Sequence, residues 1–420
     1  MRAARAVRFV PLVWLITACS PGVAPPGSAS PSPTSASAGS MDWSRHDLGT
    51  EGPQIHAMVP GGPGYIGVGG ATFNDDPGSG IWTSEDALTW TSVDPPRADR
   101  SLVDIVAGGP GFVAISASPA AVWTSPEGLT WSEVEPEPDF GDAVLTAVAA
   151  GDGRLVAVGQ GDIWTSSDGL AWQEADVPAQ EGTISDVTAG GPGFVAVGSI
   201  TVGSMEAEGV VWTSVDGRTW DRVADRPEFV KSQLLAVKAH ETKLVATGWT
   251  TDAERELFFT PSAWTSTDGL TWLRATVKDD SLPSGGLADG ALEGAVMSAL
   301  ARGPAGWVSA GTALDAGPES MTQDVAIWTT DNGDVWQRVP PHRRFEAGIS
   351  GSFRFGVSSV AASDDRVVVV GRTDGPQTTL WISPPQPGGS EPAPRPSVAV
   401  ATDEPGGVVA TPAPPAPASP

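Results

Sequence analysis

The residues with the clearest potential for binding chemistry lie in one basic, aromatic stretch of an acidic protein. The segment PPHRRFEAGISGSFRFG gathers arginines and phenylalanines, although the whole chain has 24 basic and 50 acidic residues. Arginine and aromatic side chains favour an anionic or sugar-like ligand, or a partner protein. The alternative is a loop packed by its own aromatics, with its arginines in solvent. The candidate binding residues are Arg343, Arg344, Phe345, Phe353 and Arg354.

Acidic residues in other polar segments offer a second kind of chemistry. Two carboxylates can hydrolyse a glycosidic bond, one as the acid and the other as the base or nucleophile. An acidic chain supplies many such residues, and no spacing here singles out one pair, so no catalytic residue is assigned. The acids on suitable segments are Glu256, Asp279, Asp280 and Asp289.

Metal-binding patterns are weak in this sequence. The segment FNDDPGSG offers Asn74, Asp75 and Asp76 as Ca²⁺ ligands, but a solvated loop is the simpler interpretation. The histidines lack metal-site spacing, and no Gly-x-Ser-x-Gly motif occurs. We therefore expect no metal and no cofactor. The four histidines are His46, His56, His240 and His342.

Two repeated patterns organise the elements that must position these residues. The first is a nine-residue motif with a tryptophan at each end, such as WTSTDGLTW, and it occurs six times. The second pairs two apolar runs around a Gly-rich turn, as in ISDVTAGGPGFVAVG, and it occurs seven times. Such repeats are typical of propellers and solenoids. The first motif begins at Trp82, Trp123, Trp164, Trp212, Trp264 and Trp328, and the second at Ile55, Leu102, Leu145, Ile184, Leu234, Met297 and Val357.

Each repeat reads as four short strands. An apolar residue precedes the first tryptophan of every motif, and neighbouring strand residues face opposite sides, so both faces of the sheet must be buried. We therefore predict an all-β fold over residues 41–383, a seven-bladed β-propeller of four-stranded antiparallel blades whose tryptophan pairs cement the blades. Asp104 and Asp186 would lie on innermost strands near the axis, as catalytic or metal-binding groups or, more simply, as acceptors of local hydrogen bonds.

The tryptophan motif resembles the Asp-box, or BNR, repeat of sialidase-like β-propellers. Trp328 to Trp336 fits that repeat fully, through Thr329, Asp331 and Gly333. The other five copies place the acid one position later, as at Asp86. The resemblance implies the architecture, because these boxes are structural in the family. A sialidase mechanism would need a tyrosine nucleophile. The only tyrosine, Tyr65, aligns with packing residues at the start of a strand.

Loop lengths distinguish the two ends of such a propeller. One end has turns of constant length, and we call it the constant end. The variable end carries loops that differ from repeat to repeat, which is where a rigid scaffold usually binds. Its longest loops should raise one sector: 249–263, 276–296, 312–326 and 340–356.

The function predicted from these loops is a non-catalytic binding or scaffolding module at the cell surface. It would act through the variable end, with the Arg343 cluster at the centre of the raised sector, and that cluster would contribute to binding rather than to the fold. The alternatives are a glycoside hydrolase without the usual tyrosine mechanism and, by resemblance, an assembly factor for a membrane complex. The protein or glycan ligand is left open.

Both ends of the chain have a different character. Residues 1–18 read as a bacterial lipoprotein signal peptide, because a basic and then apolar stretch leads to a lipobox-like Ile-Thr-Ala before Cys19, the only cysteine. Lipid on Cys19 would anchor the protein to the outer face of a bacterial membrane. The alternative is an ordinary secretory signal. Residues 19–40 form a Pro/Ser-rich tether, and 384–420 a disordered Pro-rich tail.

The seventh repeat lacks the strand that would carry its second tryptophan. DWSRHDL at residues 42–48 matches the missing strand, so Trp43 should pair with the Trp381 strand and close the ring.

The net charge of the mature chain restricts the kinds of partner that it can bind. Removing the signal takes away Arg2, Arg5 and Arg8, which leaves 21 basic and 50 acidic residues and a net charge of −29. Such a charge excludes nucleic acid as a partner. We expect a monomer.

Overall fold

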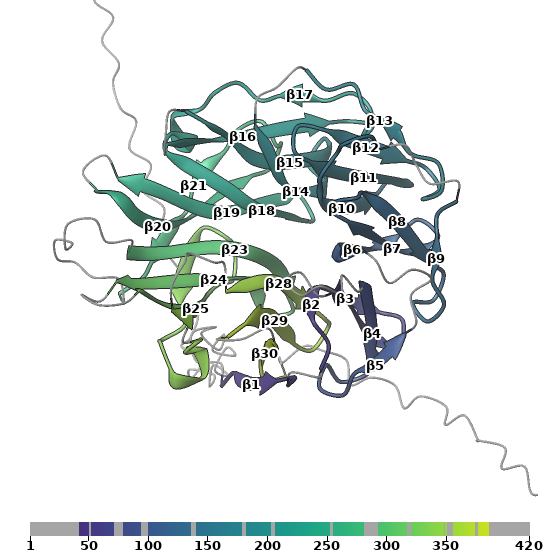
Figure 1. Cartoon of the computed structure of the whole chain (residues 1–420). Coiled ribbons are helices and arrows are strands. Elements are labelled where there is room, and N and C mark those ends of the chain that lie inside the picture. Colours follow the sequence, from purple (N-terminus) through teal and green to yellow (C-terminus); the bar gives the residue numbers. More distant parts are fainter. Residues whose placement is uncertain are drawn as a thin grey trace, which may run out of the picture. The chain divides into compact units, whose positions relative to one another are not determined.

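The protein is described here from a computed structural model, shown in Figure 1. It describes residues 42–49, 52–70, 79–93, 100–135, 140–178, 182–202, 206–252, 255–280, 293–316, 321–347, 349–350, 356–373 and 377–385. All of them belong to one compact unit, Ala38–Pro420. Within these ranges, no helix combines the length and apolar character needed to cross a membrane.

The fold is all-β, and its strands form successive sheets of the kind expected for a propeller (Figure 1). Five of the sheets have four antiparallel strands each. Four of these follow the chain directly: β2 (Ile55–Gly61), β3 (Gly64–Gly70), β4 (Ser79–Ser84) and β5 (Thr91–Val93); β6 (Leu102–Gly108), β7 (Gly111–Ser116), β8 (Ala121–Ser125) and β9 (Ser132–Glu133); β10 (Leu145–Gly151), β11 (Arg154–Gly159), β12 (Ile163–Ser166) and β13 (Gln173–Glu174); β14 (Thr183–Gly190), β15 (Gly193–Thr201), β16 (Ala207–Ser214) and β17 (Asp221–Arg222).

The fifth four-stranded sheet joins the two ends of the described chain. It combines β28 (Val357–Ala362), β29 (Val367–Arg372) and β30 (Thr378–Ile382) with β1 (Ser44–Asp47). Strand β1 pairs antiparallel with β30, and Arg45 lies opposite Trp381. The expected pairing of the Trp43 segment with the Trp381 strand is therefore present, and the N-terminal strand completes the last sheet.

The remaining strands form one ten-stranded sheet, so the prediction of seven separate four-stranded blades is wrong in this respect. Two parallel pairings join what the repeats suggested were two blades. Phe258 and Phe259 of one strand lie opposite Glu293 and Gly294 of another, and Thr276 lies opposite Val335. The ten strands are β18 (Ser232–His240), β19 (Lys243–Asp252), β20 (Arg255–Ser266), β21 (Leu273–Arg274), β22 (Thr276–Lys278), β23 (Glu293–Gly303), β24 (Gly306–Ala316), β25 (Met321–Thr330), β26 (Val335–Arg338) and β27 (Ile349–Ser350).

Two of the four segments expected to form long loops at the variable end are largely extended strands. Strands β19 and β20 stay paired out to Thr251 and Phe259, and β24 and β25 out to Ala316 and Met321. The segments 249–263 and 312–326 were expected to be loops, but extended backbone pairing satisfies their polar groups, which makes these hairpins stiffer than loops. Trp249 stacks edge-on against Phe259 with ring centroids 4.7 Å apart.

The first strands of the repeats lie side by side as a closed cycle of inner strands. Contacts connect β2, β6, β10, β14, β18, β23 and β28 in this order, and β28 returns to β2. The tryptophans pack between neighbouring sheets, as expected. One core cluster, for example, combines Val156 and Ile163 of one sheet with Phe194, Trp212 and Trp220 of the next. Trp82 and Trp90 of the first sheet are only partly buried.

The turns between the tryptophans are held by a repeated set of hydrogen bonds. Asp168 accepts from the backbone nitrogens of Leu170 and Ala171 at 2.8 and 2.9 Å, and the Trp172 indole donates to the oxygen of Gly169. These bonds hold the pKa of the exposed Asp168 carboxyl below its usual value. In the last turn Asn332, not Asp331, occupies this capping position, because it accepts from Asp334 N at 2.9 Å.

Candidate functional site

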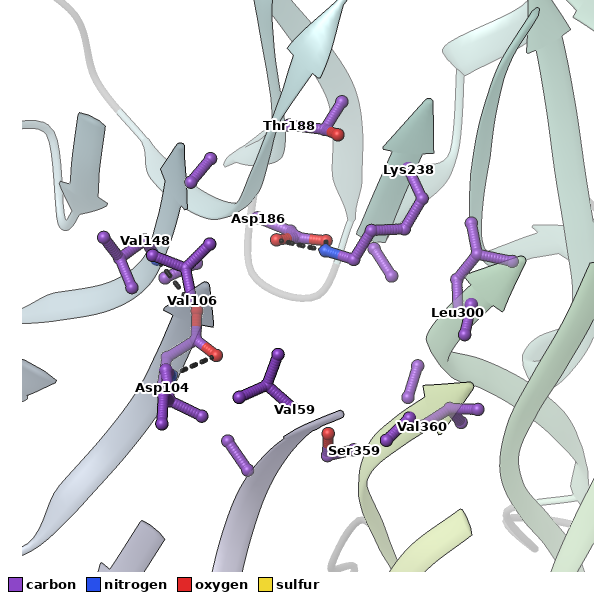
Figure 2. Close-up of a pocket in the computed structure, with 18 of the residues that line it drawn as sticks. Val59, Asp104, Val106, Val148, Asp186, Thr188, Lys238, Leu300, Ser359 and Val360 are labelled. Atoms are coloured by element: carbon purple, nitrogen blue, oxygen red, sulfur yellow. Dashed lines mark hydrogen bonds and ion pairs between the residues drawn. The ribbon is translucent and has the colours of Figure 1, made fainter. Parts of the chain in front are cut away.

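A cavity of about 520 Å³ lies among the inner strands, and it is the candidate functional site (Figure 2). Every one of the inner strands contributes residues to its lining. Most of the lining is alanine, valine or leucine. The charged side chains that line it are Asp104, Asp186, Lys238 and Arg302.

A bulge at the same place in every inner strand sets the positions that line this cavity. In β6 the register shifts between Leu102 and Asp104, and in β14 between Ile184 and Asp186. A bulge adds one residue and re-aims the side chains that follow it. The residues directly after the seven bulges are Ala57, Asp104, Ala147, Asp186, Ala236, Ala299 and Ser359.

Asp104 and Asp186 use their carboxylates to bridge neighbouring inner strands. Asp104 accepts from its own neighbour Ile105 N at 2.9 Å and from Val148 N of β10 at 2.8 Å. Asp186 repeats this arrangement with Val187 N and Val237 N, both at 2.8 Å. The expectation that each accepts local backbone hydrogen bonds is therefore confirmed.

Lys238 and Arg302 are the charged cavity residues that sequence reasoning missed, and Lys238 is the one that contacts an acid of the cavity. Its ammonium donates to both carboxylate oxygens of Asp186, at 3.1 and 2.8 Å, and Figure 2 shows the pair pointing towards each other. Burial would lower the pKa of Lys238, but Asp186 and, more weakly, Asp104 raise it above its usual value, so the lysine stays charged. One signal was available in the sequence: Lys238 stands where the other inner strands carry small, apolar or hydroxyl residues, such as Thr188.

Asp104 differs from Asp186 in its charge environment. No ion pair to Asp104 occurs among the described residues, whereas Asp186 is paired with Lys238. Burial raises the pKa of Asp104 to about 6, and the Asp186 charge adds to this effect. Lys238 and the hydrogen bonds from Val148 and Ile105 oppose it. Asp104 can therefore gain or lose a proton near neutral pH.

The Arg343 cluster lies outside this cavity and contacts the closing strand. Residues Arg343–Phe345 form a short 3-10 helix. Phe345 is buried in the core cluster that also contains Trp43 and Trp381. The Arg344 guanidinium donates to Trp43 O at 2.7 Å and also pairs with Asp42, whereas Arg343 is exposed. Arg344 and Phe345 therefore contribute to the packing of the fold, as the alternative of a self-packed loop implies for the aromatic residue.

Of the four candidate acids of a hydrolase, the structure describes the side chains of Asp279 and Asp280. Asp279 is buried in an ion pair with Arg338, with both carboxylate oxygens 3.1 Å from Nη1, and it accepts from the Trp328 indole at 3.3 Å. Asp280 is exposed. The Glu256 side chain and Asp289 lie outside the described residues. Tyr65 is a packing residue, as expected, because it is buried and donates to Ser363 Oγ at 2.9 Å.

Several other candidates from the sequence also lie outside the described residues. These are Cys19, Phe353, Arg354 and the possible Ca²⁺ ligands Asn74, Asp75 and Asp76. In the part of the chain that is described, no three His, Cys, Asp or Glu side chains are grouped as a metal would require.

Comparison with known proteins identifies the fold. No protein-family model matches the chain, and no curated protein matches it. A catalytically inactive virginiamycin B lyase from Staphylococcus aureus, solved with quinupristin, is similar over 81% of this chain and 99% of its own, at 10% identity and a TM-score of 0.52. A streptogramin B lyase is similar over 83% and 100%, at 9% identity and a TM-score of 0.47. A Trypanosoma rangeli sialidase with the inhibitor DANA is similar over 81% and 59%, at 14% identity and a TM-score of 0.41. The first of these likenesses, together with the ring of inner strands, shows that the chain is a β-propeller.

Proposed function

We propose that this protein is a non-catalytic, ligand-binding β-propeller that holds a small polar ligand in its central cavity. The observation that carries the proposal is the cavity itself, with Asp104 and the Lys238–Asp186 pair on an otherwise apolar lining. A few convergent polar groups on an apolar wall are the usual form of a small-molecule site.

The position of the acids supports entry from the variable end. Every inner strand runs from a loop at the variable end to a turn at the constant end, since its partner strand follows after that turn. Asp104 is the third residue of β6, whereas Arg302 is the residue before the last of β23. The acids therefore lie nearer the variable end, where the sequence predicts binding.

Three finer features belong to the same proposal. We infer that the ten-stranded sheet contains the fifth and sixth repeats, which would give seven blades in the ring. The tryptophan turns would be a variant of the Asp-box. The lipid on Cys19 would place the propeller at the outer face of a bacterial membrane, with the exposed Arg343 available to a partner.

A second function is favoured by one observation, the raised pKa of Asp104. A carboxyl group with a pKa of about 6 is suited to general acid or base catalysis near neutral pH. A hydrolase would also need a second free carboxylate at the site. Asp186 is engaged by Lys238 and two backbone nitrogens, so binding is the better supported function.

The test is a binding screen with a cavity-filling variant. The full-length protein would be screened by ligand-observed NMR against small polar molecules, including mono- and disaccharides, and each hit would be assayed for turnover. We expect hits that are lost in Ser359→Phe, which fills the cavity, and kept in Ser92→Phe on the exposed face of β5. Hits that survive Ser359→Phe would contradict the cavity as the site, and turnover of a hit would favour the enzyme.

A further inference from the structure

The charges around the cavity do not balance at the end where the acids lie. Asp186 and Lys238 neutralise each other through two hydrogen bonds, at 3.1 and 2.8 Å. Arg302 lies at the opposite end, where it donates to Gly303 O at 2.5 Å and stacks over the Trp307 ring. Asp104 is thus left as a carboxylate with no paired cation among the described residues that line the cavity.

The geometry of Asp104 leaves room for a further donor. Each of its oxygens accepts one backbone hydrogen bond, from Ile105 and from Val148, and a carboxylate oxygen can accept two. Figure 2 shows the Asp104 side chain at one edge of the cavity, apart from the Asp186–Lys238 pair. Four of the seven equivalent positions around the ring are alanine, so the positions level with Asp104 carry little side-chain bulk.

We infer that the cavity binds a ligand with a single protonated amino group, which donates a hydrogen bond to the Asp104 carboxylate. The Lys238–Asp186 pair stays intact, and the remaining N–H of Lys238 donates to an acceptor on the ligand. This inference rests on the proposed function of the cavity. A cation beside Asp104 would compensate the charge that has no ion-pair partner among the described cavity residues, and charge-assisted hydrogen bonds in a partly buried site are strong. A negatively charged ligand group at the same place would instead be repelled by the Asp104 carboxylate.

Three probes of the same shape separate these possibilities: cyclohexylamine, cyclohexanol and cyclohexanecarboxylate. Binding to the full-length protein would be followed by ligand-observed NMR at pH 7.5. We expect cyclohexylamine to bind at least tenfold more tightly than either other probe. Asp104→Asn should weaken amine binding at least tenfold, whereas Asp221→Asn, the same charge change on the exposed strand β17, should leave it unchanged.

The pH dependence of amine binding distinguishes the loss of the Asp104 charge from a general loss of the folded cavity. Amine binding should fall between pH 7.5 and pH 5 in the parent protein, because Asp104 becomes protonated, and it should be nearly independent of pH in Asp104→Asn. Lys238, Asp186 and Arg302, the other charged groups of the cavity, are paired or distant from Asp104. Thermal melting would verify that Asp104→Asn is folded, and Asp104→Ser would serve as a second variant.

The outcomes distinguish the preference for an amine from the proposed binding function of the cavity. Tighter binding of cyclohexanol or cyclohexanecarboxylate would overturn the amine and keep the cavity as a binding site. Amine binding unaffected by Asp104→Asn would also overturn the role of Asp104. Failure of all three probes, together with failure of the wider screen, would contradict the cavity function itself.

Discussion

The Arg344 guanidinium donates a hydrogen bond of 2.7 Å to the backbone oxygen of Trp43, and this contact links the segment before the last repeat to the N-terminal end of the described chain. In return, the Trp381 indole donates to Arg344 O at 2.5 Å, and Arg45 donates to Glu346 O at 2.7 Å. The segment around Arg344 therefore contacts both strands of the closing pair, β1 and β30. It acts as a clamp on the last sheet.

Deleting the closing strand should destabilise the propeller strongly. Removing residues 20–38 is expected to leave the melting temperature almost unchanged, but removing 20–48 also removes Trp43, which is 1% exposed. The loss of a buried tryptophan and of a paired edge should cost on the order of 3 to 5 kcal/mol in the free energy of unfolding. Denaturant unfolding of both truncations measures this, and equal stability would contradict the closure.

The two neighbouring arginines should behave differently when each is replaced. Arg344→Ala removes the hydrogen bond to Trp43 O and the pair with Asp42, so we expect a loss of about 1 to 3 kcal/mol. Arg343→Ala should change stability by less than about 0.5 kcal/mol, because its side chain is exposed. Chemical denaturation of the single variants provides the comparison. Equal effects would mean that the clamp does not stabilise the closure.

The stability of Asp104→Asn relative to the parent protein should rise between pH 4 and pH 7.5. Burial raises the pKa of Asp104 from 3.8 to about 6, so the folded protein keeps this proton where the unfolded chain has lost it. Stability therefore falls as pH rises through this window and stays lowered above it. The amide has one acceptor oxygen where the carboxylate uses two, so the variant loses one backbone hydrogen bond at every pH. The difference in the free energy of unfolding should still move in favour of the variant by about 1 to 3 kcal/mol between pH 4 and pH 7.5, as urea melts at the two pH values would measure. A stability difference between the two proteins that does not change with pH would contradict the raised pKa.

Replacing Asp279 tests a structural role against a catalytic one. The Asp279 and Arg338 side chains are 3% and 9% exposed, so Asp279→Ala leaves a buried arginine charge and should cost about 3 to 5 kcal/mol. Asp280→Ala, at the exposed neighbour, should be nearly neutral. Thermal unfolding compares the two. A stable Asp279→Ala protein that had lost a hydrolytic activity by about a hundredfold would instead support the hydrolase.

The sequence predicted the repeating parts of this molecule well, because those parts depend on local chemistry. Gly128, Gly169 and Gly217 have φ of +84°, +79° and +70°, a backbone conformation that favours glycine, and their position in the motif revealed the turns. The alternation of apolar residues likewise predicted strands buried on both faces. Even the N-terminal closing strand could be recognised, since Trp43 belongs to a motif that the last repeat lacks.

The functional groups were harder to predict, because long-range packing determines their contacts. Asp104 and Asp186 have the same place in their repeats, yet only Asp186 has a cation beside it, since Lys238 comes from the next inner strand. Arg344 looked free to bind a ligand because nothing in its local sequence shows that Trp43, from the other end of the chain, lies beside it. The parallel pairing of β20 with β23 depends in the same way on two repeats being held side by side.

The sequence by itself therefore determined the strand pattern, the turns and the ring of repeats, because these follow from periodicity and backbone conformation within a few residues. Only the tertiary structure decided which polar residues face the cavity, which charge stays unpaired there and which arginine holds the ring closed. Those outcomes depend on distances between residues far apart in the chain, and burial then sets the strength of each interaction.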